Sequence, residues 1–247
     1  MIVYEKTKGL TNAPLSYCPG CTHGIIHKLV AEVLEEMNLL KKAVGLASVG
    51  CSVMSYYYFD TDMVQAPHGR ACAVATGIKR THPDNFVFTY QGDGDLASIG
   101  LAETIHAANR GENITVIFVN NGIYGMTGGQ MAPTTLLGAK TTTSPFGRNE
   151  IDHGMPIKIS EMFATIPKAA YVERLSVSSP QAVKKAKKSI EKAFKYQLEK
   201  KGFTILEFLS TCPVNWGLTP KEALDYLDKE MTKYYPLGVY KDVNSDA

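Results

Sequence analysis

The stretch NFVFTYQGDGDLASIGLAETIHAANRGENITVIFVNN, residues 85–121, decides the fold of this chain of 247 residues. An apolar run leads into the turn sequence Gly-Asp-Gly-Asp and a helical segment, and a second apolar run follows. Continuous apolar runs of this length are typical of strands that are buried on both faces of a parallel sheet. Residues 85–121 therefore predict one βαβ crossover, which we expect to be right-handed.

Segments on either side continue this alternation of strand and helix. Further strands are expected at 43–51, ending at Cys51, and at 170–176 and 202–210. Helices are expected at 22–37, capped by Thr22, and at 68–83, 179–200 and 219–231, before a polar tail. The apolar face of the first helix consists of Ile25, Ile26, Leu29, Val30, Val33, Leu34 and Met37. The pattern predicts one doubly wound α/β domain over residues 1–247, with a mostly parallel sheet and helices on both faces.

Composition narrows the classes of protein. The formal charge is +2 with 20% charged residues, so no global field favours nucleic acid or a membrane surface. No apolar run reaches the roughly 18 to 20 residues that span a bilayer, and MIVYEKTKGL lacks the layout of a signal peptide. We therefore expect a cytoplasmic protein. Its five cysteines, an odd number, should be thiols or metal ligands and not a disulfide framework.

Polar residues follow the two strands of the central crossover. Gly92 and Gly94 permit a tight turn with the backbone close to a ligand, and the helix that follows offers free N–H groups to a phosphate. Asp93 and Asn121 supply the hard oxygen ligands that Mg²⁺ prefers. Either motif alone is more often an ordinary turn or strand end. Together, at the carboxyl edge of a parallel sheet, they predict a clamp for a metal and a diphosphate.

Four cysteines form a second candidate site. Cys18 and Cys21 lie three positions apart in SYCPGCTHG, while Cys51 and Cys212 each follow a predicted strand. If the strands are parallel, Cys51 and Cys212 emerge at the same edge as the clamp, and the Cys-x-x-Cys segment can fold over it. Four thiolates suit a [4Fe–4S] cluster or a tetrahedral zinc ion, and ligand count does not separate the two.

Other conspicuous side chains have simpler explanations. Cys72, inside a predicted helix, is expected to pack in the core. His23 and His27 are four residues apart on a helix but lack a third ligand, so surface and packing roles are favoured, with His23 nearer the cluster. Tyr56, Tyr57 and Tyr58 fit core or subunit-interface packing. The lysines of 179–200 fit a solvated face better than a docking site for an acidic ferredoxin.

Residues 122–157 are rich in Gly, Thr and Pro and too long for an ordinary connection, which indicates a functional loop. Met126 and Met131 offer apolar contacts there. Lys140 and Arg148 are candidates for binding a second carboxylate of a substrate. The loop is therefore the expected seat of substrate choice.

A resemblance adds to this interpretation. The sequence GDG, then 25 residues, then NN resembles the diphosphate-binding signature of thiamine diphosphate enzymes. The resemblance implies that Asp93, Asn121 and the carbonyl of Ile123 hold Mg²⁺. The set YCPGC-x-HG, VGCS, HGRA-x-AVATGIK, GDGDL-x-SIGL, NNGIYGMTGGQMAPTT and CPVNWG further resembles the β subunit of the 2-oxoacid:ferredoxin oxidoreductases, in the branch acting on 2-oxoglutarate or branched-chain 2-oxo acids.

That resemblance implies the roles of particular residues. Cys18, Cys21, Cys51 and Cys212 would ligate one [4Fe–4S] cluster. The thiamine diphosphate and substrate pocket would be lined by Gly50, Cys51, Ser52, His68, Gly69, Arg70, Gly94, Asp95, Gly125, Met126 and Thr127. Among these, His68, Arg70, Met126 and Thr127 are expected nearest the reacting atoms, although a structural salt bridge is the competing explanation for Arg70.

The family chemistry also implies partners. The reaction would be oxidative decarboxylation of a 2-oxo acid with coenzyme A, giving acyl-CoA and CO₂ and passing electrons to ferredoxin. The glutamate that activates the cofactor would come from an α-type subunit, with further γ and ferredoxin-like δ subunits as candidate partners, so the isolated chain should be inactive. Two alternatives stay open: the diphosphate-binding subunit of a non-redox thiamine-dependent decarboxylase, and a non-enzymatic zinc module.

Overall fold

A seven-stranded sheet with strand order β2-β1-β3-β4-β8-β7-β9 forms the centre of the computed structural model, which describes residues 5–244. Residues 1–4 and 245–247 of the predicted domain lie outside the described residues. The parallel strands are β1 (Ala43–Ala47), β2 (Asp62–Gln65), β3 (Phe86–Gly92), β4 (Thr115–Asn120), β7 (Ala169–Ser176) and β8 (Phe203–Leu209). Only β9 (Gly238–Asp242) runs antiparallel, beside β7.

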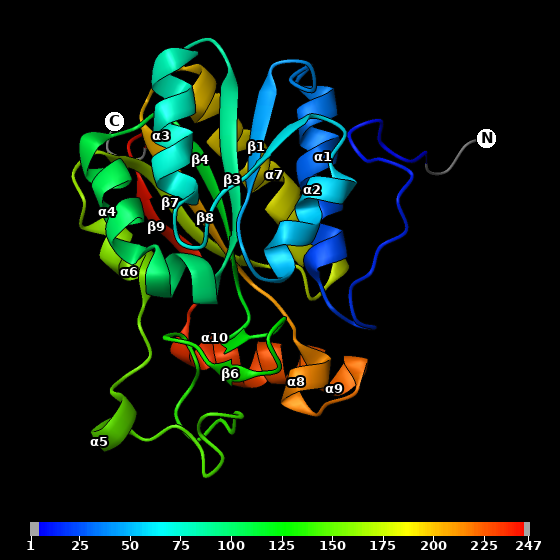
Figure 1. Ribbon diagram of the computed structural model, residues 1–247, viewed down its shortest axis with the longest axis vertical. Coiled ribbons are helices and arrows are strands. Elements are labelled where there is room, and N and C mark those ends of the chain that lie inside the picture. Colours follow the sequence, from blue (N-terminus) through cyan, green and yellow to red (C-terminus); the bar gives the residue numbers. More distant parts are fainter. Residues whose placement is uncertain (1–4, 245–247) are drawn as a thin grey trace.

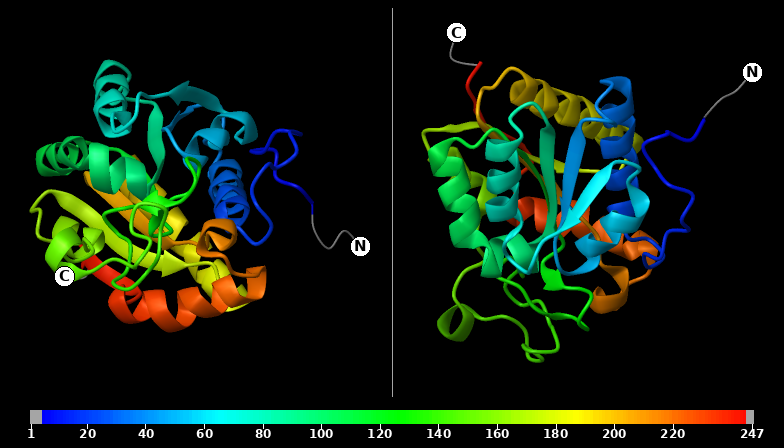
Figure 2. Two further views of the ribbon diagram at one scale, coloured as in Figure 1. Left: turned by 60° about the horizontal axis from the view of Figure 1, so that its bottom comes forward. Right: turned by 45° about the horizontal axis from the view of Figure 1, so that its top comes forward.

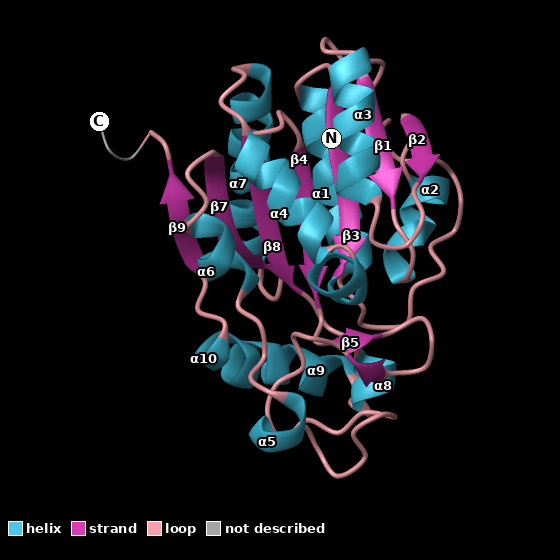
Figure 3. Ribbon diagram, turned by 60° about the vertical axis from the view of Figure 1, so that its left-hand side comes forward, coloured by secondary structure: helices cyan, strands magenta, loops and turns pink. Residues whose placement is uncertain are grey.

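Helices cover both faces of the sheet, as expected for a doubly wound fold (Figure 3). One face packs against α1 (His23–Glu36) and α7 (Pro180–Leu198), and the other against α3 (Ala71–Thr81), α4 (Leu101–Arg110) and α6 (Ile159–Ala164). Successive residues of a strand point to opposite faces, so Phe86 and Phe88 enter the first core and Val87 enters the second. Both cores are apolar, which explains the continuous apolar runs of the strands.

The carboxyl ends of the strands carry most of the irregular structure (Figures 1 and 2). The loop after β4 forms a small antiparallel ribbon, β5 (Ile123–Tyr124) with β6 (Gln130–Met131), and the short helix α5 (Glu150–His153). After β8 come α8 (Pro213–Trp216), α9 (Pro220–Tyr226), a π-helical turn (Leu227–Met231) and α10 (Thr232–Tyr234). These helices and the loop share a third core around Leu209, Met231 and Tyr235.

Four local predictions near α1, β1 and β3 were wrong: the end of one strand, a helix cap, one residue of an apolar face and a turn. Strand β1 ends at Ala47, and Cys51 instead opens a 3₁₀ helix (Cys51–Met54) that leads into α2 (Ser55–Tyr58). Thr22 precedes α1, but its hydroxyl bonds the Ser210 hydroxyl at 2.7 Å and does not cap the helix. Ile25 is 37% exposed because its position points away from the sheet. The GDGD segment makes no separate turn, since a π-helical turn (Asp95–Ile99) continues directly into α4.

Several elements were not predicted from the sequence, among them β2, β9 and α6. Strands β2 and β9 lie at the two edges of the sheet and mix polar with apolar residues, so neither shows an apolar run. Helix α6 is only six residues long, and its buried Ile159 and Phe163 give too short a pattern.

The three tyrosines at 56–58 have different environments, because Tyr58 is buried while Tyr56 and Tyr57 are exposed. Within residues 5–244, no helix has the length and apolarity needed to cross a bilayer.

Candidate functional site

A cavity of about 110 Å³, here called the edge cavity, lies at the carboxyl ends of β1, β3 and β4. Segments far apart in the sequence converge on it, as the parallel arrangement requires. From the predicted cofactor residues it takes Gly50, Cys51, Ser52, His68, Asp93, Gly94, Asp95, Asn121, Ile123, Gly125, Met126 and Thr127. Its remaining lining residues are His23, Val49, Gly92 and Tyr124. Gly69 and Arg70 are not part of the lining.

Asp93 and Asn121 present their oxygens side by side in this cavity. The Ile123 N–H donates to Asp93 Oδ2 and to Asn121 Oδ1, at 3.2 Å in each case, so the two oxygens share one donor. Asp93 also accepts hydrogen bonds from the Gly94 N–H (2.8 Å) and the Thr134 hydroxyl (2.7 Å). Burial nevertheless raises the pKa of Asp93 to about 6. A nearby cation would favour the ionised carboxylate, so the donor set fits a hard metal ion such as Mg²⁺.

Glycines at the edge cavity leave room that the chain itself does not fill. A Cβ on Gly92 would meet no protein atom within 4 Å, and its φ is not left-handed, so nothing within the chain requires glycine there. A Cβ on Gly94, in contrast, would come within 2.4 Å of the Tyr124 ring. Close approach of a bound group to the backbone would account for the glycine at position 92. The cavity therefore fits a ligand that lies against the β3 carboxyl end.

A second cavity of about 140 Å³, here called the thiol cavity, adjoins the first. Cys18, Cys21, Cys51 and Cys212 all line it, and the two cavities share His23, Cys51, Asn121, Gly125 and Met126. A Cβ on Gly125 would lie 3.4 Å from the sulfurs of both Cys51 and Cys212. The four cysteines thus line one cavity, which shares Asn121 with the edge cavity.

The four thiols are free, and Cys212 Sγ accepts a hydrogen bond from Asn215 Nδ2 at 3.2 Å. Burial raises the pKa of Cys21 to about 12 and that of Cys51 to about 11, and it also raises the pKa of Cys212. Without a positive ligand they would stay protonated at neutral pH, and metal binding would release their protons. Among residues 5–244, no three His, Cys, Asp or Glu side chains come close enough to share one metal ion.

Two histidines form a buried layer beneath both cavities. His23 Nδ1 lies 2.8 Å from the Tyr90 hydroxyl, and the Tyr17 ring stacks on His23 at 4.8 Å. His27 Nε2 lies 3.3 Å from the Tyr17 hydroxyl, which itself donates to the Cys51 carbonyl. The expected surface role was wrong, because both rings are buried, whereas the packing role is confirmed. His23 does reach the thiol cavity, as expected.

The HGR segment separates into three different roles. His68 lines the edge cavity and its Nδ1 lies 2.5 Å from Asp95 Oδ1. Gly69 donates its N–H to the same oxygen at 2.6 Å and approaches the backbone of Gly100 too closely for a side chain. Arg70 pairs with Glu103 at 2.9 Å, with its side chain 46% exposed. Within this chain the salt bridge accounts for Arg70, and a direct place for Gly69 and Arg70 in the cavity is not supported.

Arg148 does not point to a substrate. It is 5% exposed and its guanidinium donates to six backbone carbonyls, so the prediction that it binds a carboxylate was wrong. The bonded carbonyls belong to Ala132, Pro133, Thr135, His153, Gly154 and Met155. A buried guanidinium needs all its donors satisfied, and here it holds the long loop in shape. Lys140 lines another cavity, of about 230 Å³, together with Trp216 and Tyr226, and this cavity shares Asn121 and Ile123 with the edge cavity.

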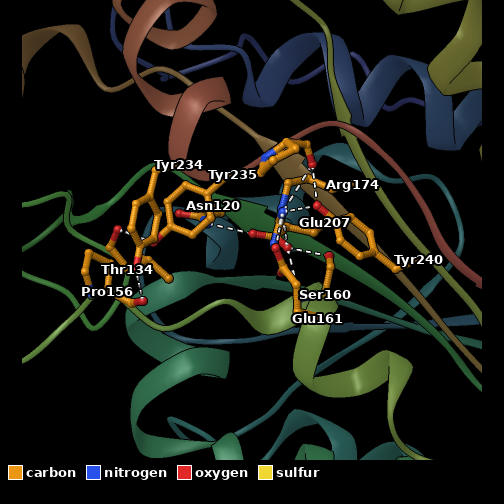
Figure 4. A network of polar contacts seen from close by, with 11 residues as sticks. Asn120, Thr134, Pro156, Ser160, Glu161, Arg174, Glu207, Tyr234, Tyr235 and Tyr240 are labelled. Atoms are coloured by element: carbon orange, nitrogen blue, oxygen red, sulfur yellow. Dashed lines mark hydrogen bonds and ion pairs between the residues drawn. The ribbon is translucent and has the colours of Figure 1, made fainter.

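Sequence patterns missed the residues that support the clamp from behind. Thr134 bonds Asp93 through its hydroxyl and accepts a hydrogen bond from the Tyr235 hydroxyl at its carbonyl (Figure 4). Asn120 donates to Glu207, which pairs with the fully buried Arg174 at 2.9 Å. Nothing in the local sequence marks Tyr235 or Glu207, because each acts through partners from distant segments. Thr134 lies inside the quoted NNGIYGMTGGQMAPTT motif, and this was the only available signal.

Comparisons with known proteins agree with this geometry. Residues 48–208 match the family model described as thiamine pyrophosphate enzyme, C-terminal TPP binding domain. The chain therefore belongs to the thiamine diphosphate enzymes, as a member of that domain family.

More specific relatives are subunits of 2-oxoacid oxidoreductases. Ketoisovalerate oxidoreductase subunit VorA of Methanothermobacter thermautotrophicus is 46% identical over 245 residues, which is 99% of this chain and 51% of the relative. The 2-oxoglutarate synthase subunit KorB of Archaeoglobus fulgidus is 36% identical, over 93% of this chain and 80% of the relative. The chain belongs to this family of 2-oxoacid:ferredoxin oxidoreductase subunits, although it spans only about half the length of the VorA relatives.

A solved structure gives the same fold. The 2-oxoglutarate:ferredoxin oxidoreductase from Magnetococcus marinus, with 2-oxoglutarate, coenzyme A and succinyl-CoA bound, superposes with a TM-score of 0.77. Sequence identity is 27%, and the match covers 98% of this chain and 86% of that chain. The predicted doubly wound α/β fold and the predicted family are thereby confirmed.

Proposed function

We propose that this chain is the cofactor-binding subunit of an enzyme that decarboxylates a 2-oxo acid oxidatively, with coenzyme A as acyl acceptor and ferredoxin as electron acceptor. The observation that carries the proposal is the contact between the edge cavity and the thiol cavity, which share Cys51 and Gly125. A non-redox decarboxylase subunit would need the clamp but not four cysteines beside it. Membership of the oxidoreductase family argues in the same direction.

The residues that would hold each group follow from their chemistry. Asp93, Asn121 and the carbonyl of Ile123 would bind Mg²⁺, and Gly92 would let the diphosphate lie against the backbone. Cys18, Cys21, Cys51 and Cys212 would hold a [4Fe–4S] cluster. When bound, thiamine diphosphate supplies the carbon nucleophile and the cluster a one-electron acceptor. The protein contributes orientation, exclusion of water and a short path between the two.

His68, Met126 and Thr127 would face the substrate. All three line the edge cavity, and Met126 is 48% exposed, so it can cover a bound ligand. We propose a branched-chain 2-oxo acid as the substrate, because identity is greater to the ketoisovalerate relative and because Arg148 is fully engaged by carbonyls. The alternative substrate is 2-oxoglutarate, for which Lys140 would be the remaining cation of the loop.

An α-type partner with the pyrimidine-binding domain and the activating glutamate would complete the active site, with γ and ferredoxin-like δ subunits as further candidates. The relatives are named as subunits, which supports an assembly. Five free thiols and an oxygen-sensitive cluster fit the reducing cytoplasm.

Anaerobic co-purification from the native cell tests this function. We expect a brown complex that absorbs at about 400 nm, bleaches on reduction, and contains iron and sulfide. With a 2-oxo acid and coenzyme A it should reduce a viologen dye. A panel of substrates then ranks branched-chain acids against 2-oxoglutarate. Colourless protein with stoichiometric zinc would overturn the redox assignment, and turnover without any electron acceptor would favour the decarboxylase.

The ligand assignment has its own matched pair of variants. Cys212→Ala should lose the cluster, whereas Cys72→Ala should keep it, because Cys72 is buried in the core away from the thiol cavity. Iron content and the visible spectrum report the result independently of activity. Equal iron content in both variants would contradict the four-cysteine assignment.

A further inference from the structure

Asp95 is a buried carboxylate surrounded by hydrogen-bond donors. It is 1% exposed, and its Oδ1 lies 2.5 Å from His68 Nδ1 and 2.6 Å from the Gly69 N–H. Its Oδ2 accepts a bond from Gln91 Nε2 at 2.6 Å. All three bonds are short, and no solvent competes for the carboxylate. Both oxygens of Asp95 are therefore engaged by the protein.

Gln91 has a fixed orientation, although its two amide ends have the same shape. It is fully buried on β3, and the Asp95 carboxylate requires the NH₂ end on its side. The carbonyl end then faces Cys72, whose thiol donates to Gln91 Oε1 at 3.3 Å. The Thr104 hydroxyl lies 3.5 Å from the same sulfur. Cys72, which has no part in the thiol cavity, thus sits at the far end of a hydrogen-bonded chain.

The chain of bonds sets the tautomer of His68. A lone pair on Nδ1 would face a carboxylate lone pair at 2.5 Å, so the proton must be on Nδ1. The other ring nitrogen, Nε2, is on the opposite side of the ring and bonds no group among the described residues. His68 has 30% of its side chain exposed and lines the edge cavity beside Asp93 and Thr127. When the ring is neutral and Nδ1 carries the proton, a ligand in that cavity meets an acceptor nitrogen.

We propose that Cys72, Gln91 and Asp95 are positioning residues that hold His68 as the Nδ1–H tautomer, so that Nε2 accepts a hydrogen bond from an N–H or O–H group of the ligand in the edge cavity. This inference rests on the proposed function for the nature of that ligand. The tautomer of His68 itself depends only on residues of this polypeptide and not on the ligand.

Nitrogen NMR of the full chain, labelled with ¹⁵N-histidine, tests the tautomer without any ligand. We expect His68 to show the Nδ1–H form, and the exposed His106 serves as a reference signal in the same spectrum. Asp95→Leu removes the oxygen that accepts the Nδ1 proton, and the Nε2–H form of His68 should then appear. A wild-type His68 with its proton on Nε2, or an unchanged pattern in a folded Asp95→Leu, would overturn the proposal.

The role of Cys72, at the far end of the row of hydrogen bonds, is tested by removing and then restoring its donor. Cys72→Ala leaves Gln91 Oε1 without its donor and should weaken binding of Mg²⁺–thiamine diphosphate to the assembled complex by about tenfold. Cys72→Ser restores a donor and should restore affinity, with iron content unchanged in both. Equal affinities for the Ala and Ser variants would overturn the role of Cys72. If wild type fails to bind the cofactor, the proposed function fails, while the tautomer result still stands.

Discussion

Two glycines at the edge cavity, Gly92 and Gly94, have different reasons for being glycine. Gly94 is required by the protein, because the Tyr124 ring occupies the space of a side chain. Gly92 is not, since the space beside it is open. The difference separates glycines that serve the fold from glycines that serve a ligand.

Gly92→Ala should fold normally and lose cofactor. The added methyl group meets no protein atom but would fill the space of the diphosphate, so affinity for Mg²⁺–thiamine diphosphate should fall by about 100-fold or more, or roughly 3 kcal/mol. Gly77→Ala is the control, because it also has open space but lies in α3. Calorimetric titration of the assembled complex measures both variants. Undiminished binding by Gly92→Ala would move the diphosphate away from β3.

At the scale of elements, α1 contributes two histidines that the fold keeps uncharged. Burial lowers the pKa of His23 to about 4 and that of His27 well below its usual value, with the neighbouring His23 adding to the effect on His27. His27 Nδ1 has no hydrogen-bond partner, which agrees with an unprotonated nitrogen. Packing among Tyr17, Phe59 and Tyr90 thus depends on neutral rings.

Acid should therefore destabilise the protein in a defined window. Between pH 6.5 and about 4 the unfolded chain binds protons that the folded chain excludes, so stability falls as the pH is lowered, by roughly 3 kcal/mol for His23 alone. The loss of unfolding free energy between pH 7 and pH 5 should be smaller in His27→Gln than in wild type, by about 1 kcal/mol or more. Urea unfolding at the two pH values measures this. The exposed His106→Gln should behave like wild type.

Buried ion pairs join the elements behind the site. Arg174 on β7 bonds Glu207 on β8 and Glu161 on α6, and its guanidinium lies over the rings of Tyr235 and Tyr240 (Figure 4). Arg174 and Glu207 are both fully buried. Removing one partner of such a pair leaves a charge without compensation.

Glu207→Gln should cost about 3 to 5 kcal/mol of unfolding free energy. Asp225→Asn breaks an exposed pair with Lys229, at 3.9 Å, and should cost less than about 0.5 kcal/mol. Denaturant unfolding of both variants at neutral pH gives the comparison. Similar costs for the two would mean that the β7–β8 pair is not needed for stability.

At the scale of the whole molecule, the loop at the carboxyl edge carries large apolar side chains into solvent. Phe146 is 97% exposed, and Ile151 on α5 is 96% exposed. Helix α5 lies beyond the carboxyl ends of the strands (Figure 1). Large apolar side chains that are exposed to solvent are typical of an interaction surface. The proposed α-type partner would need to reach the edge cavity from this side.

Replacing both residues, Phe146→Ser with Ile151→Ser, should therefore weaken association with the α-type partner by at least about tenfold while leaving the melting temperature of the chain unchanged. Val243→Ser, also an exposed apolar position but after β9, is the control. Analytical ultracentrifugation of the mixed subunits provides the measurement. Full association of the double variant would place the partner elsewhere.

The sequence alone determined the alternation of buried strands and helices, the GDG and NN motifs at strand ends and the four cysteines, because each depends on local pattern or residue chemistry. It misplaced Arg148 and the surface role of the histidines, and the prediction of a single domain over 1–247 stays a prediction. Only the tertiary structure decided that Arg148 binds carbonyls, that Thr134 supports Asp93, and that Asp95 holds His68. These roles depend on contacts between residues distant in the chain, and periodicity carries no information about which distant side chains meet.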